Sequence, residues 1–215
     1  DGLHALVLPN QKSEHININS LGLRGDEISQ KGDSYRIIVI GGSAVFGAKT
    51  TSDLTAIPNQ LELLLKSDLG DEVEVINSGI GGADSYHEVK LIEEKLLNLN
   101  PDMIIVYDGW NDLMNPLKKT QNETYDLDTQ IFLKKIESYI YLPRAIEQIN
   151  HKIYSTIYLQ TNGVSYTTYS EDKEEDFIKK AEIWSDRWNN ECKKLSNENI
   201  DIYIFLQPIL GTSNK

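Results

Sequence analysis

Short apolar runs alternate with amphipathic segments in the first half of the chain. The runs at 35–40, 73–76 and 103–107 are rich in β-branched residues, which is typical of buried parallel strands. The segments at 53–69 and 85–99 carry leucine, isoleucine and valine at helical spacing. This alternation predicts βαβ units and a parallel sheet covered on both faces.

The second half is less regular. Helical spacing recurs at 131–150, with an interruption near Pro143, and 171–197 reads as a long helix with an acidic start that suits the positive end of a helix dipole. The run at 200–206 predicts a fourth strand. The whole pattern predicts an α/β fold with a mostly parallel sheet between two layers of helices.

One domain is the simplest organisation for 215 residues. Residues 1–34 are polar and turn-rich and are expected to form an N-terminal leader, with a short strand near 15–19. Residues 35–215 are expected to form the α/β domain. We expect a fifth strand beyond the last residue, so that the C-terminal part of the domain is missing from the sequence.

Charge and composition limit the partners. Lys and Arg number 21 against 33 Asp and Glu, a formal net charge of −12, which argues against nucleic acid and against anionic lipid. The single cysteine, Cys192, builds neither a disulfide framework nor a cysteine metal site. No apolar run approaches the length of a membrane span. The compartment and the oligomeric state stay open, including an extracytoplasmic or a membrane-anchored location.

Glycine and small polar residues follow three successive predicted strands, at 41–43, 77–82 and 109–112. Because ligands bind at the carboxyl ends of strands in a doubly wound sheet, we expect these clusters to meet at one rim. A phosphate loop would need a Gly-Lys-Ser/Thr ending and a dinucleotide fingerprint a Gly-x-Gly-x-x-Gly pattern, and neither is present. A Gly-x-Ser-x-Gly nucleophile elbow fails because Val45 replaces the second glycine.

The three clusters together resemble the sequence blocks of SGNH/GDSL hydrolases. Residues 41–47 (GGSAVFG) resemble the first block, with Gly42 where the name-giving motif has Asp; residues 77–82 (NSGIGG) resemble the second; and residues 109–112 (GWND) resemble the third. Residues 19–25 (NSLGLRG) also resemble the lead-in of one branch of this superfamily. The resemblance extends from about residue 10 to Pro208. It implies a three-layer α/β/α fold with a flavodoxin-like, mostly parallel sheet, for which we expect the strand order 2-1-3-4.

The resemblance implies a serine esterase or acylhydrolase that needs no cofactor and no metal. Ser43 would be the nucleophile, and its backbone N–H, the N–H of Gly82 and the side-chain amide of Asn111 would hold the oxyanion. Gly81 and Gly79 are alternatives to Gly82. Each residue also has an ordinary reading, with Ser43 as a helix cap, Gly82 as a turn glycine and Asn111 as an N-cap.

A serine nucleophile needs a base, and the resemblance implies an Asp-x-x-His pair after the last strand. The histidines are His4, His15, His87 and His151. Residues 84–87 (DSYH) have the Asp-x-x-His spacing, but they follow the second block directly, so a surface histidine at a helix start is the expected role of His87. The catalytic His is therefore expected beyond residue 215.

Several functions stay open at this point. The expected substrate is a carboxylic ester of a carbohydrate, a lipid or another small molecule, cleaved through an acyl-enzyme. Acyl transfer is an alternative, as is a catalytically inactive SGNH-like binding module. A nucleotide- or flavin-binding domain is a further rival, against which the missing phosphate-loop lysine counts.

Overall fold

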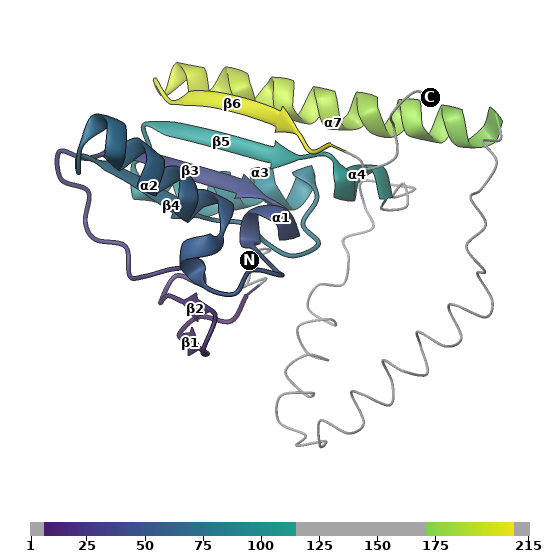
Figure 1. Cartoon of the computed structure of the whole chain (residues 1–215). Helices are drawn as coiled ribbons and strands as arrows, with labels where there is room; N and C mark the ends of the chain where they lie inside the picture. The colour runs from purple at the N-terminus through teal and green to yellow at the C-terminus, as the bar shows by residue number, and fades with distance from the viewer. Residues whose placement is uncertain (1–6, 115–170, 209–215) are drawn as a thin grey trace, which may run out of the picture. The chain divides into compact units, whose positions relative to one another are not determined.

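The computed structural model describes residues 7–114 and 171–208 (Figure 1). Of these residues, 7–114 and 177–208 belong to one compact unit. The helix predicted at 131–150 lies outside the described residues. No helix in the described part of the chain combines the length and the apolar character that a membrane crossing requires.

The elements follow the predicted order. In chain order they are β1 (Gln11–Lys12), β2 (Asn17–Ile18), β3 (Tyr35–Gly41), α1 (Ser43–Phe46), the 3₁₀ helix η1 (Asp53–Thr55), α2 (Ile57–Leu69), β4 (Val73–Asn77), α3 (Ser85–Glu94), the 3₁₀ helix η2 (Leu96–Leu99), β5 (Met103–Asp108), α4 (Trp110–Met114), α7 (Glu171–Asn197) and β6 (Asp201–Leu206).

The main sheet has four strands in the order β4-β3-β5-β6, and all of its pairs are parallel. Val39 pairs with Asn77, and Gly41 pairs with Tyr107, so β4, β3 and β5 end close to the same edge of the sheet. Numbered along the chain, these strands have the order 2-1-3-4, which confirms the prediction.

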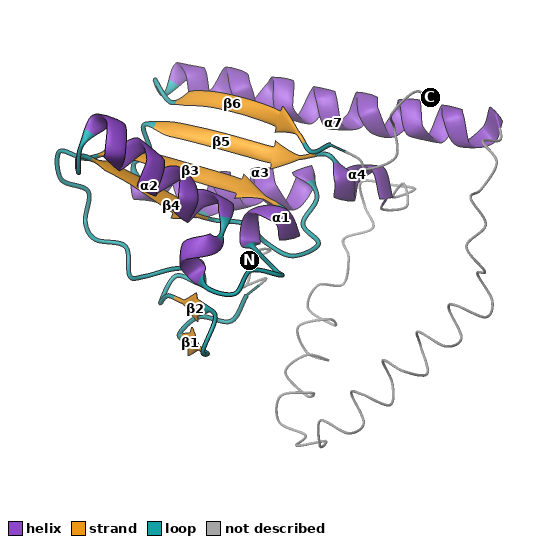
Figure 2. Ribbon diagram, viewed as in Figure 1, coloured by secondary structure: helices purple, strands orange, loops and turns teal. Residues whose placement is uncertain are grey.

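Helices cover both faces of the sheet, which confirms the predicted three-layer arrangement (Figures 1 and 2). On one face, Leu61 and Leu65 of α2 pack against a cluster that contains Val39. On the other face, Ile92 of α3 and Trp188 of α7 are buried with the remaining strand residues. Burial of each such side chain contributes about 1.5–3 kcal/mol to folding.

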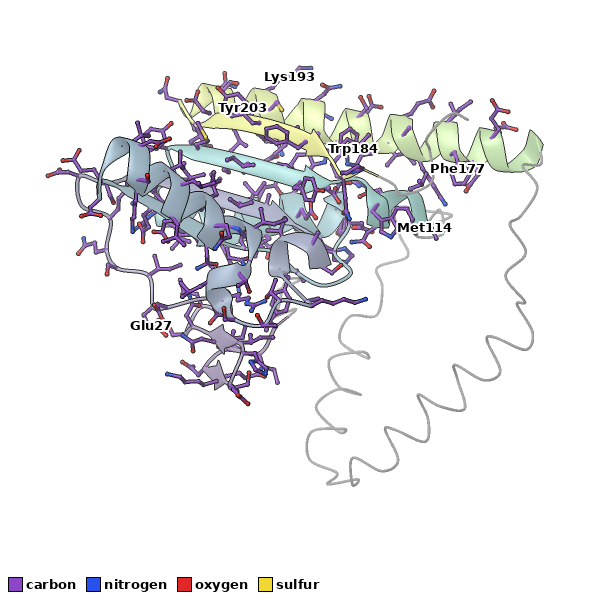
Figure 3. All side chains as sticks on the ribbon, in the orientation of Figure 1. Glu27, Met114, Phe177, Trp184, Lys193 and Tyr203 are labelled. Carbon is purple, nitrogen blue, oxygen red and sulfur yellow. The ribbon has the colours of Figure 1, made fainter. Side chains whose placement is uncertain are left out.

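The edge strand β6 is covered on one face and open on the other. Ile202 and Ile204 pack against the cluster that contains α7, whereas Tyr203 and Phe205 are 53% and 54% exposed. Figure 3 shows Tyr203 standing on this strand. The period of two places alternate side chains on opposite faces, so the strand is half-buried.

Two predicted helices are shorter than their apolar spacing suggests. The segment at 53–69 divides into η1 and α2, because Pro58 lacks an N–H and is tolerated only in the first turn of a helix. The segment at 85–99 divides into α3 and η2 at Lys95, which leaves helical geometry with φ −131° and ψ −50°.

The residues ahead of β3 pack onto the sheet unit. Strands β1 and β2 pair antiparallel, and Arg24 forms isolated bridges with both Ile18 and Asn77. Leu23 is buried in the same cluster as α3 and α7. This segment therefore reaches the carboxyl end of β4, where the predicted site lies.

Candidate active site

The three glycine-rich clusters follow strands that run in the same direction. Gly41, Asn77 and Asp108 are the last residues of β3, β4 and β5. In Figure 2 the arrowheads of these strands point the same way, and α1 and α4 begin beyond those of β3 and β5. The expectation that the clusters meet at one rim is supported by contacts between them.

Ser43 is the first residue of α1 and is exposed. Gly42 before it is extended, with φ −77° and ψ −150°, and its carbonyl oxygen accepts a hydrogen bond from the N–H of Phe46 at 3.0 Å. The chain thus passes from strand to helix within one residue. The first N–H groups of a helix have no intrahelical acceptor, so the N–H of Ser43 has no partner within α1.

The loop after β4 is fastened to β3 and α1. The N–H and the hydroxyl of Ser78 both donate to the carbonyl oxygen of Val39 at 2.9 Å, and the N–H of Ile80 donates to that of Gly41 at 2.9 Å. A Cβ on Gly79 would lie 2.1 Å from the backbone nitrogen of Phe46. Close packing therefore accounts for glycine at this position.

Asn111 joins the three clusters. Its Nδ2 donates to the carbonyl oxygen of Ala83 at 2.6 Å, and a Cβ on Gly42 would lie 2.5 Å from the same Nδ2. A carbonyl oxygen only accepts, so the amide nitrogen must face Ala83. Asn111 lies inside α4 rather than at its N-cap. Gly42, Ala83 and Asn111 are therefore neighbours.

Gly82 lies one residue from Ala83 and is exposed. Its φ of +80° is left-handed, and its added Cβ would meet no atom within 4 Å. Backbone conformation, not crowding, thus favours glycine here. Gly81 is also exposed but lacks the positive φ. The oxyanion role of Gly82 stays a prediction.

Asp112 links its own helix, α4, to α3 and α7. Its carboxylate accepts a hydrogen bond from the N–H of Ser85 at 2.8 Å and a shorter one from the Ser85 hydroxyl. Arg187 of α7 donates to the same carboxylate at 3.4 Å and also contacts the Ser85 hydroxyl. These contacts fix the residues after β5 against α3 and α7.

Two buried carboxyl groups lie next to this network, and sequence reasoning missed both. Burial and the charge of Asp112 raise the pKa of Asp108 from 3.8 to about 7, while Trp184 of α7 donates to its Oδ2 at 3.2 Å (Figure 3). Burial, and then the charges of Asp108 and Asp112, raise the pKa of Glu88 well above its ordinary value. The sequence contained one indication that Glu88 is buried. It lies four residues before the apolar Ile92, so helical periodicity places both side chains on the same face of α3.

His87 forms a local pair with the N-cap of α3. Asp84 Oδ1 accepts the backbone N–H of His87 at 3.3 Å and lies 2.6 Å from its Nδ1. Asp84 is thus the N-cap of α3, and its carboxylate contacts both the backbone N–H and the ring of His87 at the third helical position. This position agrees with the expected place of His87 at a helix start. His4 and His151 lie outside the described residues.

Arg24 belongs to the lead-in motif at 19–25, which gives no indication of its contacts. Its side chain is fully buried and contacts the C-terminal end of α1. Asp53, which pairs with it at 2.6 Å, lies 29 residues away along the chain. A buried arginine in a polar leader gives no periodic signal, so only the structure identifies this contact.

Comparison with known proteins gives structural neighbours alone. No family model matches the chain, and no curated protein matches it. The solved structure of AlinE4, an SGNH-hydrolase family esterase, is 28% identical and has a TM-score of 0.32, with 39% of this chain matching 44% of that one. This chain thus spans less than half of that protein.

Two further solved structures are acetyl xylan esterases. AlAXEase is 16% identical over 79% of this chain and 76% of its own, with a TM-score of 0.38. A variant of Axe2 from Geobacillus stearothermophilus is 16% identical over 76% of both chains, with a TM-score of 0.36. The three solved structures are thus all esterases, and AlinE4 is described as a member of the SGNH-hydrolase family.

Proposed function

We propose that this protein is a serine hydrolase that cleaves carboxylic esters through an acyl-enzyme, with Ser43 as the nucleophile. The observation that carries the proposal is the meeting of Gly42, Ala83 and Asn111. It brings the residue before the nucleophile, the loop of Gly82 and a side-chain amide together at the ends of three strands. An exposed hydroxyl and several N–H donors are the parts that acyl transfer requires.

The proposed reaction has two halves. The Ser43 hydroxyl oxygen bonds to the ester carbonyl carbon while its proton passes to a histidine base. The oxyanion receives the N–H groups of Ser43 and Gly82 and the second N–H of the Asn111 amide. The carbon–oxygen bond to the alcohol breaks as the alcohol oxygen takes the proton from the base. Water then cleaves the acyl-enzyme by the same steps.

The base is assigned to a histidine other than His15 and His87. His15 lies in the leader, and the Asp84–His87 pair opens α3 directly after the second block, whereas the resemblance places the Asp-x-x-His pair after the last strand. The proposed substrate is an acyl or acetyl ester of a carbohydrate, a lipid or a small molecule. The same machinery serves acyl transfer when an alcohol replaces water.

A fluorophosphonate probe tests the proposal on the full-length protein. Such probes bond to activated serine hydroxyls, so we expect labelling of the wild type and none of Ser43→Ala. Ser67→Ala, which removes an exposed hydroxyl on α2, is the matched control and should label fully. His87→Ala should also label. A folded wild type that does not label refutes the hydrolase and leaves the binding module.

A further inference from the structure

Arg24 is enclosed at the end of the nucleophile turn. None of its side chain is exposed, and it pairs with Asp53 through Nε at 2.6 Å. Its Nη1 donates to the carbonyl oxygens of Phe46 and Gly47, both at 2.7 Å, and its Nη2 donates to that of His15 at 3.2 Å. Four of the five N–H donors of a guanidinium thus have acceptors.

The two carbonyl groups belong to the end of α1. This helix has only four residues, too few to be stable without contacts outside itself. Its last carbonyl oxygens have no intrahelical donors, and a positive charge is favoured at a helix C-terminus. Arg24 supplies both the donors and the charge.

Ser43 is coupled to Arg24 through one residue. The carbonyl oxygen of Ser43 accepts the N–H groups of Gly47 at 3.0 Å and Ala48 at 3.1 Å. The carbonyl oxygen of Gly47 in turn accepts from Arg24. Gly47 has a left-handed φ of +79°, and a Cβ on it would lie 2.8 Å from Arg24 Nη1. The guanidinium therefore packs directly against the residue that closes the turn.

The guanidinium itself is held in place by the leader. The second carboxylate oxygen of Asp53 accepts the backbone N–H of Asn17 at 3.0 Å, so Asp53 links β2 to Arg24. The loop after β4 also packs closely against α1, since a Cβ on Gly79 would lie 2.1 Å from the backbone nitrogen of Phe46. The turn is thus fixed between two segments that are distant in sequence.

We propose that Arg24 is a positioning residue for Ser43, acting through the carbonyl groups of Phe46 and Gly47 to fix the turn that presents the nucleophile. The inference rests on the proposed function. Arg24 has no contact with the Ser43 hydroxyl, so it acts through the two carbonyl groups and through the Phe46 ring, whose centroid lies 5.4 Å from its Cζ. The lead-in motif at 19–25 thereby gains a role in the site.

Arg36 provides a matched control. It is 2% exposed, pairs with Glu74 at 2.7 Å, and donates to the carbonyl oxygens of Leu99 at 2.5 Å and Ser29 at 2.9 Å. It therefore has the same kinds of partner as Arg24. It lies at the beginning of β3, however, whereas Ser43 follows the end of that strand.

The experiment compares Arg24→Lys with Arg36→Lys in the full-length protein. Lysine keeps the charge but lacks the planar fork, so it cannot serve all four acceptors. The readouts are fluorophosphonate labelling rate, kcat and KM with p-nitrophenyl acetate, thermal unfolding, and hydrogen exchange of the Gly47 and Ala48 amides. We expect Arg24→Lys to lower the labelling rate and kcat by about 10–100-fold with little change in KM.

The control separates positioning from stability. Both variants should lower the unfolding temperature, but Arg36→Lys should label at the wild-type rate. Faster exchange at Gly47 and Ala48 is expected only in Arg24→Lys. Equal loss of labelling in both variants, or wild-type kinetics in Arg24→Lys, overturns the inference.

An Arg24→Lys protein that does not fold and a wild type that does not label each have a test of their own. If Arg24→Lys does not fold, Asp53→Asn replaces it, because it keeps Arg24 and removes the group that holds it; the same kinetic and exchange changes are then expected at smaller size. If the wild type itself does not label, the proposed function fails. The contact of Arg24 with the turn is then tested by hydrogen exchange alone. Unchanged exchange of the Gly47 and Ala48 amides in Arg24→Lys would show that Arg24 does not fix the turn.

Discussion

The side-chain amide of Asn111 donates to the backbone carbonyl oxygen of Ala83 at 2.6 Å. An amide nitrogen carries two hydrogens, so this bond occupies one of them and fixes the direction of the other. Ala83 directly follows Gly82, another of the proposed oxyanion donors. The orientation of the Asn111 amide is therefore tied to the backbone of the β4 loop.

Replacing Asn111 with Asp tests this relationship. A carboxylate would set an oxygen against the Ala83 carbonyl oxygen and would offer no donor to the oxyanion. We expect kcat/KM for p-nitrophenyl acetate to fall by about 10²–10³-fold. Asn98→Asp is the control, because the exposed Asn98 also donates its Nδ2 to a backbone carbonyl, that of Glu94 at 3.3 Å. Activity of a folded Asn111→Asp protein within about threefold of the wild type contradicts the assignment.

Gly42→Ala probes the space beside the same amide. The new Cβ would fall 2.5 Å from Asn111 Nδ2, so the Asn111 side chain must move away from its bond to Ala83. We expect kcat to fall by about 10–100-fold through this displacement. Gly81→Ala, whose Cβ would meet no atom within 4 Å, should keep wild-type kinetics. Equal activity of the two variants argues against the Asn111 role.

Much of the fold was predictable because its signals are local. The runs that became β3, β4, β5 and β6 are short, apolar and followed by glycine, asparagine or proline, and their alternation with helical segments predicts parallel strands. The order of the strands came from the family resemblance. The predicted long helix at 171–197 matches α7. Where the sequence misled, at Pro58 and Lys95, one residue interrupts otherwise continuous apolar spacing.

The site was predictable in its parts but not in its connections. Ser43, Gly82 and Asn111 could be chosen because they follow strands whose ends share one edge. The pairing of Arg24 with Asp53 and the contact of Asp112 with Arg187 join segments 29 and 75 residues apart. Periodicity reports which face a residue occupies and not which distant group it meets, so such pairs need the structure.

Asp108→Asn tests the buried carboxyl group at the end of β5. The pKa of Asp108 is about 7 in the fold, against about 3.9 for an unfolded chain, so the folded state holds a proton that the unfolded state has lost. The free energy of unfolding should therefore fall as the pH rises from about 4 to about 7, by at most about 1.4 kcal/mol per pH unit for this one group.

Urea unfolding at about pH 5 and about pH 8 measures this effect. We expect Asp108→Asn to lose less stability than the wild type over this interval. Glu88, whose pKa is also raised, keeps part of the slope. Asp68→Asn, a change at an exposed position of α2, should follow the wild type. An identical pH slope in Asp108→Asn and the wild type would show that Asp108 is already ionised at low pH.

Asp112→Asn separates the two causes of the Asp108 shift. Burial is the larger cause and the charge of Asp112 the second, so neutralising Asp112 should lower the pKa of Asp108 from about 7 while leaving it above 3.8. A carbon-13 titration of the Asp108 carboxyl group measures the change directly. Asp102→Asn is the control, because Asp102 lies before the start of β5 and pairs with Lys31 at 2.6 Å. In Asp112→Asn the side-chain oxygen can still accept the N–H of Ser85, so the contact of α4 with α3 should persist. Arg187 loses its ionic partner in this variant. An unchanged Asp108 titration would mean that burial alone holds its proton, and that the Asp112 carboxylate is screened by Arg187.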